Sequence, residues 1–168
     1  MKVLFLVHDC LTVPLGVSYL AALSRDKGHC VKALSLTGGS IEQEIGEFDP
    51  DVIGFGSTTG FHRQYLKLVK PIRETLGIPV IMGGAHPTFF PEVMDENPWL
   101  DFAMRGEADH SFPLFLDALE GKMLLEDVGN LIYRKSGEIV HNPILPLVKD
   151  LDSIPVRFLG YQIPDGVI

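Results

Sequence analysis

Glycine, serine and threonine gather directly after several short apolar runs of this sequence, where they could bind a ligand without carrying charge. Residues 56–59 read Gly-Ser-Thr-Thr, and residues 83–88 read Gly-Gly-Ala-His-Pro-Thr. Hydroxyl groups donate and accept hydrogen bonds, and glycine lets a ligand approach the backbone. A helix cap and a tight turn are the alternative roles for these two segments. The candidate contacts are Gly56, Ser57, Thr58, Thr59, Gly83, Gly84, His86 and Pro87.

Two other segments that follow apolar runs have a related composition. Residues 8–16 form a roomy, mostly uncharged loop with Leu11, Thr12, Val13 and Gly16 as candidate contacts. Residues 105–109 place Gly106 and Glu107 before a helical pattern, where carboxylates either contact a ligand or favour the helix N-terminus through its dipole. Together the four segments suit a large neutral ligand better than one compact anion.

The apolar runs themselves predict an α/β fold. Each run is short, and helical spacing or turn residues separate it from the next, which is typical of buried parallel strands joined by helices. We therefore expect a five-stranded, parallel, doubly wound sheet of flavodoxin-like or Rossmann type, whose ligands bind beyond the carboxyl ends of the strands. The expected strands are residues 3–7, 31–36, 52–56, 79–82 and 101–104.

The pattern changes after Gly121. Residues 130–141 alternate around Ser136-Gly137 as a β-hairpin does, and residues 143–168 contain several prolines without sustained periodicity. A short helix is expected at residues 41–48 and a brief one within residues 87–97, which include Pro91. The expected organisation is an α/β domain at 1–125, a hairpin appendage at 126–142, and an extended tail or linker at 143–168.

Composition limits the choice of partners and compartment. The net charge of −8 disfavours nucleic acid and anionic membranes, which are bound largely through Lys and Arg. No apolar stretch approaches the roughly 20 residues that span a bilayer, and no targeting signal is visible. The two cysteines, Cys10 and Cys30, favour a reducing, cytoplasmic setting and a role in core packing.

The order of these segments resembles the N-terminal cobalamin-binding domain of B12-dependent radical S-adenosylmethionine enzymes. The resemblance extends from residue 1 to about residue 155, and it implies cobalamin, in a hydroxo-, methyl- or related form, as the cofactor. The cobalt would then be held within the corrin rather than by a protein metal site. The matching segments are residues 14–23, 50–57, 83–88, 105–107, 130–133 and 150–155.

The resemblance also implies how the cofactor is held. In the wider B12-binding superfamily, an Asp-x-His-x-x-Gly motif supplies a histidine to cobalt; here Gly16 matches, but Leu11 and Val13 stand at the Asp and His positions. Valine cannot ligate cobalt, so we expect no protein histidine ligand from this motif. His8 and His86 stay open as alternative contacts to the cobalt or the tail. Ser57 matches the Ser-x-Leu motif, with Thr59 in place of leucine, and the Gly83-Gly84 pair matches the glycines beside the dimethylbenzimidazole tail.

The B12-dependent radical S-adenosylmethionine enzymes that this chain resembles continue into a radical domain with a Cys-x-x-x-Cys-x-x-Cys motif. This chain lacks that motif. An iron–sulfur cluster and S-adenosylmethionine would therefore belong to an absent C-terminal partner domain, and no catalytic residue is assigned to this chain. The alternatives are a flavodoxin-like FMN-binding domain and a cofactor-free docking module. A phosphoacceptor signalling domain is disfavoured, because Ser57 and Arg105 replace the aspartate and lysine that it requires.

Overall fold

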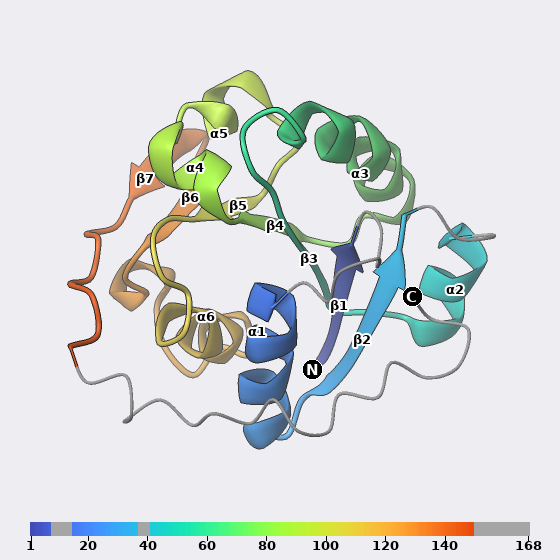
Figure 1. Cartoon of the computed structure of the whole chain (residues 1–168), viewed down its shortest axis with the longest axis horizontal. Coiled ribbons are helices and arrows are strands. Elements are labelled where there is room, and N and C mark those ends of the chain that lie inside the picture. Colours follow the sequence, from blue (N-terminus) through green and yellow to red (C-terminus); the bar gives the residue numbers. More distant parts are fainter. Residues whose placement is uncertain (8–14, 37–40, 150–168) are drawn as a thin grey trace.

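The computed structural model describes residues 1–7, 15–36 and 41–149 of the 168-residue chain, and its centre is one twisted β-sheet (Figure 1). The sheet has seven strands in the order β2-β1-β3-β4-β5-β6-β7. The strands are β1 (Lys2–Val7), β2 (Cys30–Ser35), β3 (Val52–Gly56), β4 (Val80–Gly83), β5 (Phe102–Met104), β6 (Leu131–Lys135) and β7 (Glu138–His141).

The parallel α/β architecture expected from the sequence is confirmed, but the sheet is larger than predicted. Strands β1 to β5 pair in parallel, and β6 then joins the edge of β5 in antiparallel register, with Phe102 opposite Tyr133. Residues Leu131, Ile132 and Tyr133 are buried in the core. The predicted hairpin is therefore part of the main sheet and not an appendage, because β6 covers an edge that β5 would otherwise expose.

Helices cover both faces of the sheet, with α1 and α6 together on one face and α3 on the other (Figure 1). Where a single brief helix was expected at residues 87–97, the chain forms two, because Pro91 restricts the preceding Phe90 to non-helical backbone. No helix of the described ranges is long and apolar enough to cross a bilayer. The helices are α1 (Leu15–Asp26), α2 (Ile41–Phe48), α3 (His62–Leu76), α4 (Ala85–Phe89), α5 (Val93–Glu96), α6 (Ser111–Leu119) and the 3₁₀ helix η1 (Leu125–Asp127).

Alternate residues of the central strands enter two separate cores. In β1, Leu4 and Leu6 join the core beneath α2 and α3, while Val3 and Phe5 join the core beneath α1 and α6. Burial on both faces explains why the strand sequences are almost continuously apolar. Cys30, expected in the core, is instead exposed at the start of the edge strand β2.

The order of the strands creates a topological switch point between β1 and β3. The chain leaves β1 for β2 on one side and later continues from β3 to β4 on the other side. Connections that leave in opposite directions open a crevice beyond the carboxyl ends of the strands. A ligand site is therefore expected between the loops that follow β1 and β3.

Asp101 joins three elements below this crevice. Its two carboxylate oxygens accept hydrogen bonds from Arg73 of α3, at 2.7 and 2.9 Å, and one of them also accepts a bond from the backbone N–H of Val80, at 2.8 Å. The carboxylate thus ties α3 and the start of β4 to the start of β5.

We expect Asp101→Ala to lower the free energy of unfolding by about 2–3 kcal/mol, because it removes charged hydrogen bonds and leaves Val80 N–H without its acceptor. Urea denaturation measures the change. Glu74→Ala is the control: its ion pair with Lys70 is long, at 3.8 Å, and exposed, so its loss should cost less than about 0.5 kcal/mol. Equal losses in the two variants would contradict the role given to Asp101.

Candidate functional site

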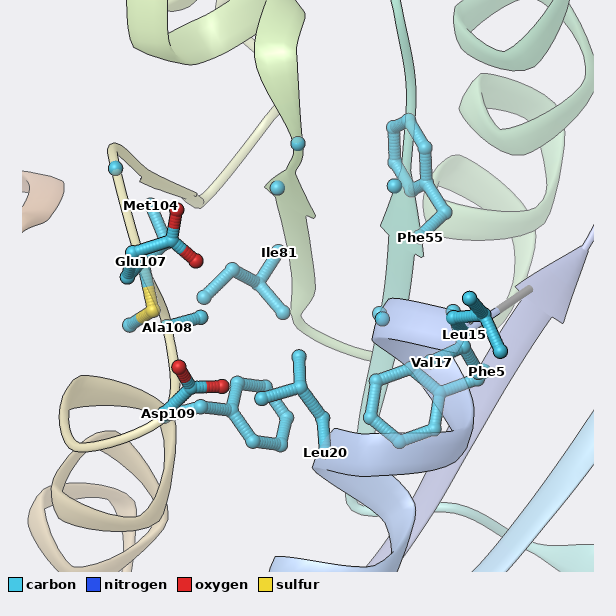
Figure 2. Close-up of a pocket in the computed structure, with 17 residues that line it drawn as sticks. Phe5, Leu15, Val17, Leu20, Phe55, Ile81, Met104, Glu107, Ala108 and Asp109 are labelled. Atoms are coloured by element: carbon cyan, nitrogen blue, oxygen red, sulfur yellow. The ribbon is translucent and has the colours of Figure 1, made fainter. Parts of the chain in front are cut away.

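A cavity of about 330 Å³ lies between the sheet and the helices α1 and α6 (Figure 2). Phe5, Ile81 and Met104 line it from strands β1, β4 and β5, while Leu20 of α1 and Phe112 of α6 line it from the helices. Its volume falls at the lower end of the range for small-molecule sites, roughly 300–1,000 Å³. The cavity occupies the switch point that the strand order predicts.

Glycine residues form much of the cavity wall. At Gly56 and Gly83, which end β3 and β4, a Cβ atom would meet no heavy atom within 4 Å. The space that side chains would fill is therefore open, and a ligand there can contact the backbone. The glycines that line the cavity are Gly16, Gly54, Gly56, Gly83, Gly84 and Gly106.

Gly84 has a different role, because its backbone packs directly on the backbone of Ser57. A Cβ atom at Gly84 would lie 2.8 Å from the carbonyl oxygen of Ser57 and 2.9 Å from its nitrogen. Its φ of +93° is also one that side-chain-bearing residues rarely adopt. Ser57 N–H donates to Gly83 O at 3.0 Å, and His86 N–H donates to Ser57 O at 3.0 Å.

Side-chain hydrogen bonds connect the contact between Gly84 and Ser57 to the loop that follows β5. The Thr88 hydroxyl donates to Gly84 O and accepts from Gly106 N–H, both at 2.9 Å. Asn130, which precedes β6, donates through Nδ2 to Glu107 O at 2.8 Å. The loops that follow β3, β4 and β5 are thus fixed relative to one another.

A shallower groove of about 360 Å³ adjoins the cavity at the end of β3. Ser57, Thr58 and Ala85 line it together with two aromatic residues of the α3 region, Phe61 and Tyr65. Gly56 and Gly84 line both the groove and the cavity, so the two spaces meet at these glycines.

Glu107 and Asp109 are the only charged side chains among the described residues that line the cavity, and both carboxylates lie on its β5–α6 side (Figure 2). Burial first, and then the nearby charge of Glu107, raise the pKa of Asp109 above its ordinary value. Within the described ranges, no cluster of three or more His, Cys, Asp or Glu side chains could hold a metal ion.

The structure brings together most of the predicted contacts that it describes. Gly16, Gly56, Gly83, Gly84, Gly106 and Glu107 line the cavity, and Ser57 and Thr58 line the adjoining groove. The predicted contacts Leu11, Thr12 and Val13 lie outside the described residues.

Thr59, His86 and Pro87 line neither space. His86 is only 6% exposed, its ring stacks on that of His62 at a centroid distance of 3.6 Å, and its Nδ1 lies 3.2 Å from Thr59 Oγ1. Burial, and then the charge of His62, lower the pKa of His86. Contact of these three residues with a ligand stays a prediction, and their observed contacts are within the protein.

The sequence interpretation missed the apolar half of the cavity. The residues Phe5, Leu20, Ile81, Met104 and Phe112 follow strand or helix periodicity, which indicates burial but not whether a side chain faces a void. Asp109 did carry a signal, as a carboxylate just after β5. That signal was equally compatible with a helix cap.

An α/β domain with an apolar, glycine-walled cavity at the switch point of its sheet belongs to the class of Rossmann-like ligand-binding domains. The model of the "B12 binding domain" family matches residues 1–116. The chain therefore belongs to the B12-binding domain family, and the expected cofactor, cobalamin, is the ligand for which this family is named.

Curated relatives extend well beyond this chain. An uncharacterized methyltransferase of Pyrococcus horikoshii is 37% identical over 173 residues, which cover 92% of this chain and 37% of the relative. An anaerobic magnesium-protoporphyrin IX monomethyl ester cyclase of Synechocystis is 28% identical over 161 residues, which cover 90% of this chain and 32% of the cyclase. The chain thus spans about a third of the length of these relatives.

Solved structures share the fold. The cobalamin-dependent S-adenosylmethionine radical enzyme OxsB, with aqua-cobalamin and S-adenosylmethionine bound, aligns with a TM-score of 0.71 and 18% identity over 87% of this chain and 22% of its own. The radical S-adenosylmethionine methyltransferase TsrM from Kitasatospora setae, with cobalamin and a [4Fe-4S] cluster bound, aligns with a TM-score of 0.71 and 17% identity. The alignment covers 89% of this chain and 30% of TsrM.

Gly84→Ala should lower the free energy of unfolding by about 3 kcal/mol, because the new methyl group meets Ser57 backbone atoms and the φ angle is strained. Gly83→Ala is the matched control one residue earlier, where the methyl group enters open space, and it should change stability by less than about 0.5 kcal/mol. Thermal and urea unfolding measure both variants. A stable Gly84→Ala protein would show that the Ser57 contact is not required.

Proposed function

We propose that this chain binds cobalamin with the corrin against the loops at the carboxyl ends of β3 to β5 and the dimethylbenzimidazole tail in the cavity beneath α1 and α6. The observation that carries the proposal is the cavity itself, which is apolar inside and open along the glycines at the strand ends. The proposed cofactor contacts that the structure describes are Gly16, Gly56, Ser57, Thr58, Gly83, Gly84, Gly106 and Glu107. Leu11, Thr12 and Val13 belong to the same proposal from the sequence alone.

The residues present fit such a ligand. The tail ends in a flat aromatic base, and Phe5, Phe112, Ile81 and Leu20 offer it apolar contacts. The hydroxyl groups at the end of β3 offer hydrogen bonds to a neutral ligand without imposing a charge. When bound, the cobalt of the corrin supplies the group-transfer or redox chemistry, while this chain supplies position and shelter from water.

We further propose that no protein histidine coordinates the cobalt. Val13 stands where the superfamily motif has its histidine. His86 and His62 stack on each other, and His86 also contacts Thr59. The hydrogen-bonding and stacking partners of both rings are therefore within the protein.

The relatives suggest that the binding unit serves a larger enzyme. OxsB and TsrM are described as radical S-adenosylmethionine enzymes, and the chain matches less than a third of either. We propose a cytoplasmic enzyme of the methyltransferase type or a related one, whose separate domain binds the iron–sulfur cluster and S-adenosylmethionine. The α/β unit would then comprise residues 1–142, since β6 and β7 complete the sheet, and residues 143–168 would lead towards that domain.

Cobalamin binding can be tested directly with the 168-residue chain. After incubation with hydroxocobalamin, corrin absorbance should co-elute with the protein in gel filtration. Gly83→Leu should weaken binding by about tenfold or more, because the side chain enters the open space at the end of β4.

Gly46→Leu is the control, since Gly46 is an exposed residue of α2 with no heavy atom near its Cβ position, and it should bind as the unchanged chain does. Absence of a co-eluting corrin would reject the proposal. A parallel incubation with FMN separates the flavin alternative, because flavin absorbance would co-elute instead.

Electron paramagnetic resonance of the bound Co(II) cofactor tests the cobalt ligand. With the tail in the cavity and no histidine ligand, the cobalt signal should lack splitting from an axial nitrogen, because neither the benzimidazole nor an imidazole is coordinated. Labelling the protein histidines with ¹⁵N identifies the source of any splitting that appears. A splitting that changes with this label would overturn the proposed absence of a histidine ligand.

A further inference from the structure

Asp109 is a carboxylate inside a cavity that is otherwise mainly apolar, and within the described ranges its side chain forms no hydrogen bond or ion pair. Figure 2 shows its carboxylate among the side chains that line the cavity, on the β5–α6 side. The residue is partly buried, whereas Glu107, the other charged lining residue, is exposed. A carboxylate that is removed from water carries a cost unless a partner satisfies it.

The role of a helix cap does not explain Asp109. The N-cap residue of α6 is His110, and no side-chain hydrogen bond caps that end of the helix. None of the hydrogen bonds and ion pairs among the described residues involves the Asp109 carboxylate. Asn130, which anchors this loop, donates to Glu107 O and to the Ser111 hydroxyl and not to Asp109.

The surrounding groups favour a proton on Asp109. Burial and then Glu107 raise its pKa, while the nearby His110 lowers it by a smaller amount. From α1, Tyr19 faces the same carboxylate, and burial followed by the charge of Asp109 raises the pKa of this phenol. No lysine or arginine of the described ranges lines the cavity to hold Asp109 ionised.

The ligand proposed above brings a complementary group. A benzimidazole that has left cobalt carries an uncoordinated ring nitrogen with a lone pair, and this nitrogen becomes an unsatisfied acceptor if it is buried among apolar side chains. A carboxylic acid can donate to it, and a carboxylate can accept from its protonated form. Either arrangement needs one proton between the two groups.

We propose that Asp109 shares one proton with the released benzimidazole nitrogen of the bound cofactor and thereby selects cobalamin in the form whose tail has left cobalt. This role depends on the cobalamin-binding function proposed above. It makes Asp109 a specificity-determining residue for the tail.

The proton balance gives the sign of the pH dependence. Where the free chain carries Asp109 as a carboxylate and the free cofactor carries an unprotonated base, formation of the complex takes one proton from solvent. Binding should therefore weaken as pH rises, by up to about tenfold per pH unit above the pKa that Asp109 has in the free chain. Below that pKa the proton is already present and the dependence disappears.

The test uses methylcobalamin and cobinamide, which has the corrin but lacks the nucleotide tail. The Kd of the unchanged chain for methylcobalamin, from absorbance titrations, should rise with pH between pH 6 and pH 8, by up to about tenfold per pH unit. The Kd for cobinamide should stay constant over this range. Calorimetry in two buffers of different protonation enthalpy should show uptake of about one proton with methylcobalamin only.

Two near-isosteric variants complete the design. Asp109→Asn should abolish both the proton uptake and the pH dependence for methylcobalamin while leaving cobinamide binding unchanged. Glu74→Gln, at an exposed carboxylate of α3 outside the cavity, should keep the pH dependence. Equal pH dependence in Asp109→Asn, or the same dependence with cobinamide, would overturn the role of Asp109 while leaving cobalamin binding intact. If the unchanged chain binds neither corrinoid, the proposed function fails and this inference fails with it.

Discussion

The backbone of Gly84 lies against the backbone of Ser57 so closely that a methyl group has no room between them. This contact holds the start of the loop after β4 against the end of β3, and hydrogen bonds from Ser57 N–H and His86 N–H secure it on both sides. Thr88 then connects Gly84 to Gly106, and so to the loop that carries Glu107 and Asp109. The mouth of the cavity is defined by loops whose relative positions follow from one close backbone approach.

The two faces of the sheet differ in how completely they are filled. Beneath α2 and α3, large side chains such as Ile45, Tyr65 and Val69 pack into a continuous core. Beneath α1 and α6, Gly54 allows the Phe5 ring to lie across β3, since a Cβ atom there would come within 3.1 Å of that ring. The absence of side chains at Gly56 and Gly83 leaves open space at the ends of β3 and β4, and this space is part of the cavity.

The segment that leaves the sheet is attached to the same site. Asn130 N–H donates to Pro143 O at 2.9 Å, and its Oδ1 accepts from Leu145 N–H at 2.7 Å. Arg105 donates to Asn142 O at 2.7 Å. Because Asn130 also bonds to Glu107 O, the path of residues 142–145 and the wall of the cavity share one set of hydrogen bonds. Under the proposed function, this arrangement would fix residues 142–145 relative to the bound cofactor.

The sequence by itself determined the features that depend on local patterns. Continuous apolar runs predicted the parallel strands, because strands buried on both faces need apolar residues at every position. Pairs such as Gly83-Gly84 predicted where a ligand could approach the backbone.

Only the tertiary structure decided that Gly84 serves the Ser57 contact while Gly83 borders open space, since the neighbours of each glycine come from other strands. It also decided that β6 joins β5, and that Leu20 and Phe112 face a void and not a filled core. Periodicity reports that a side chain is buried, but a cavity arises from incomplete packing between α1, α6 and the sheet, which are distant in the sequence.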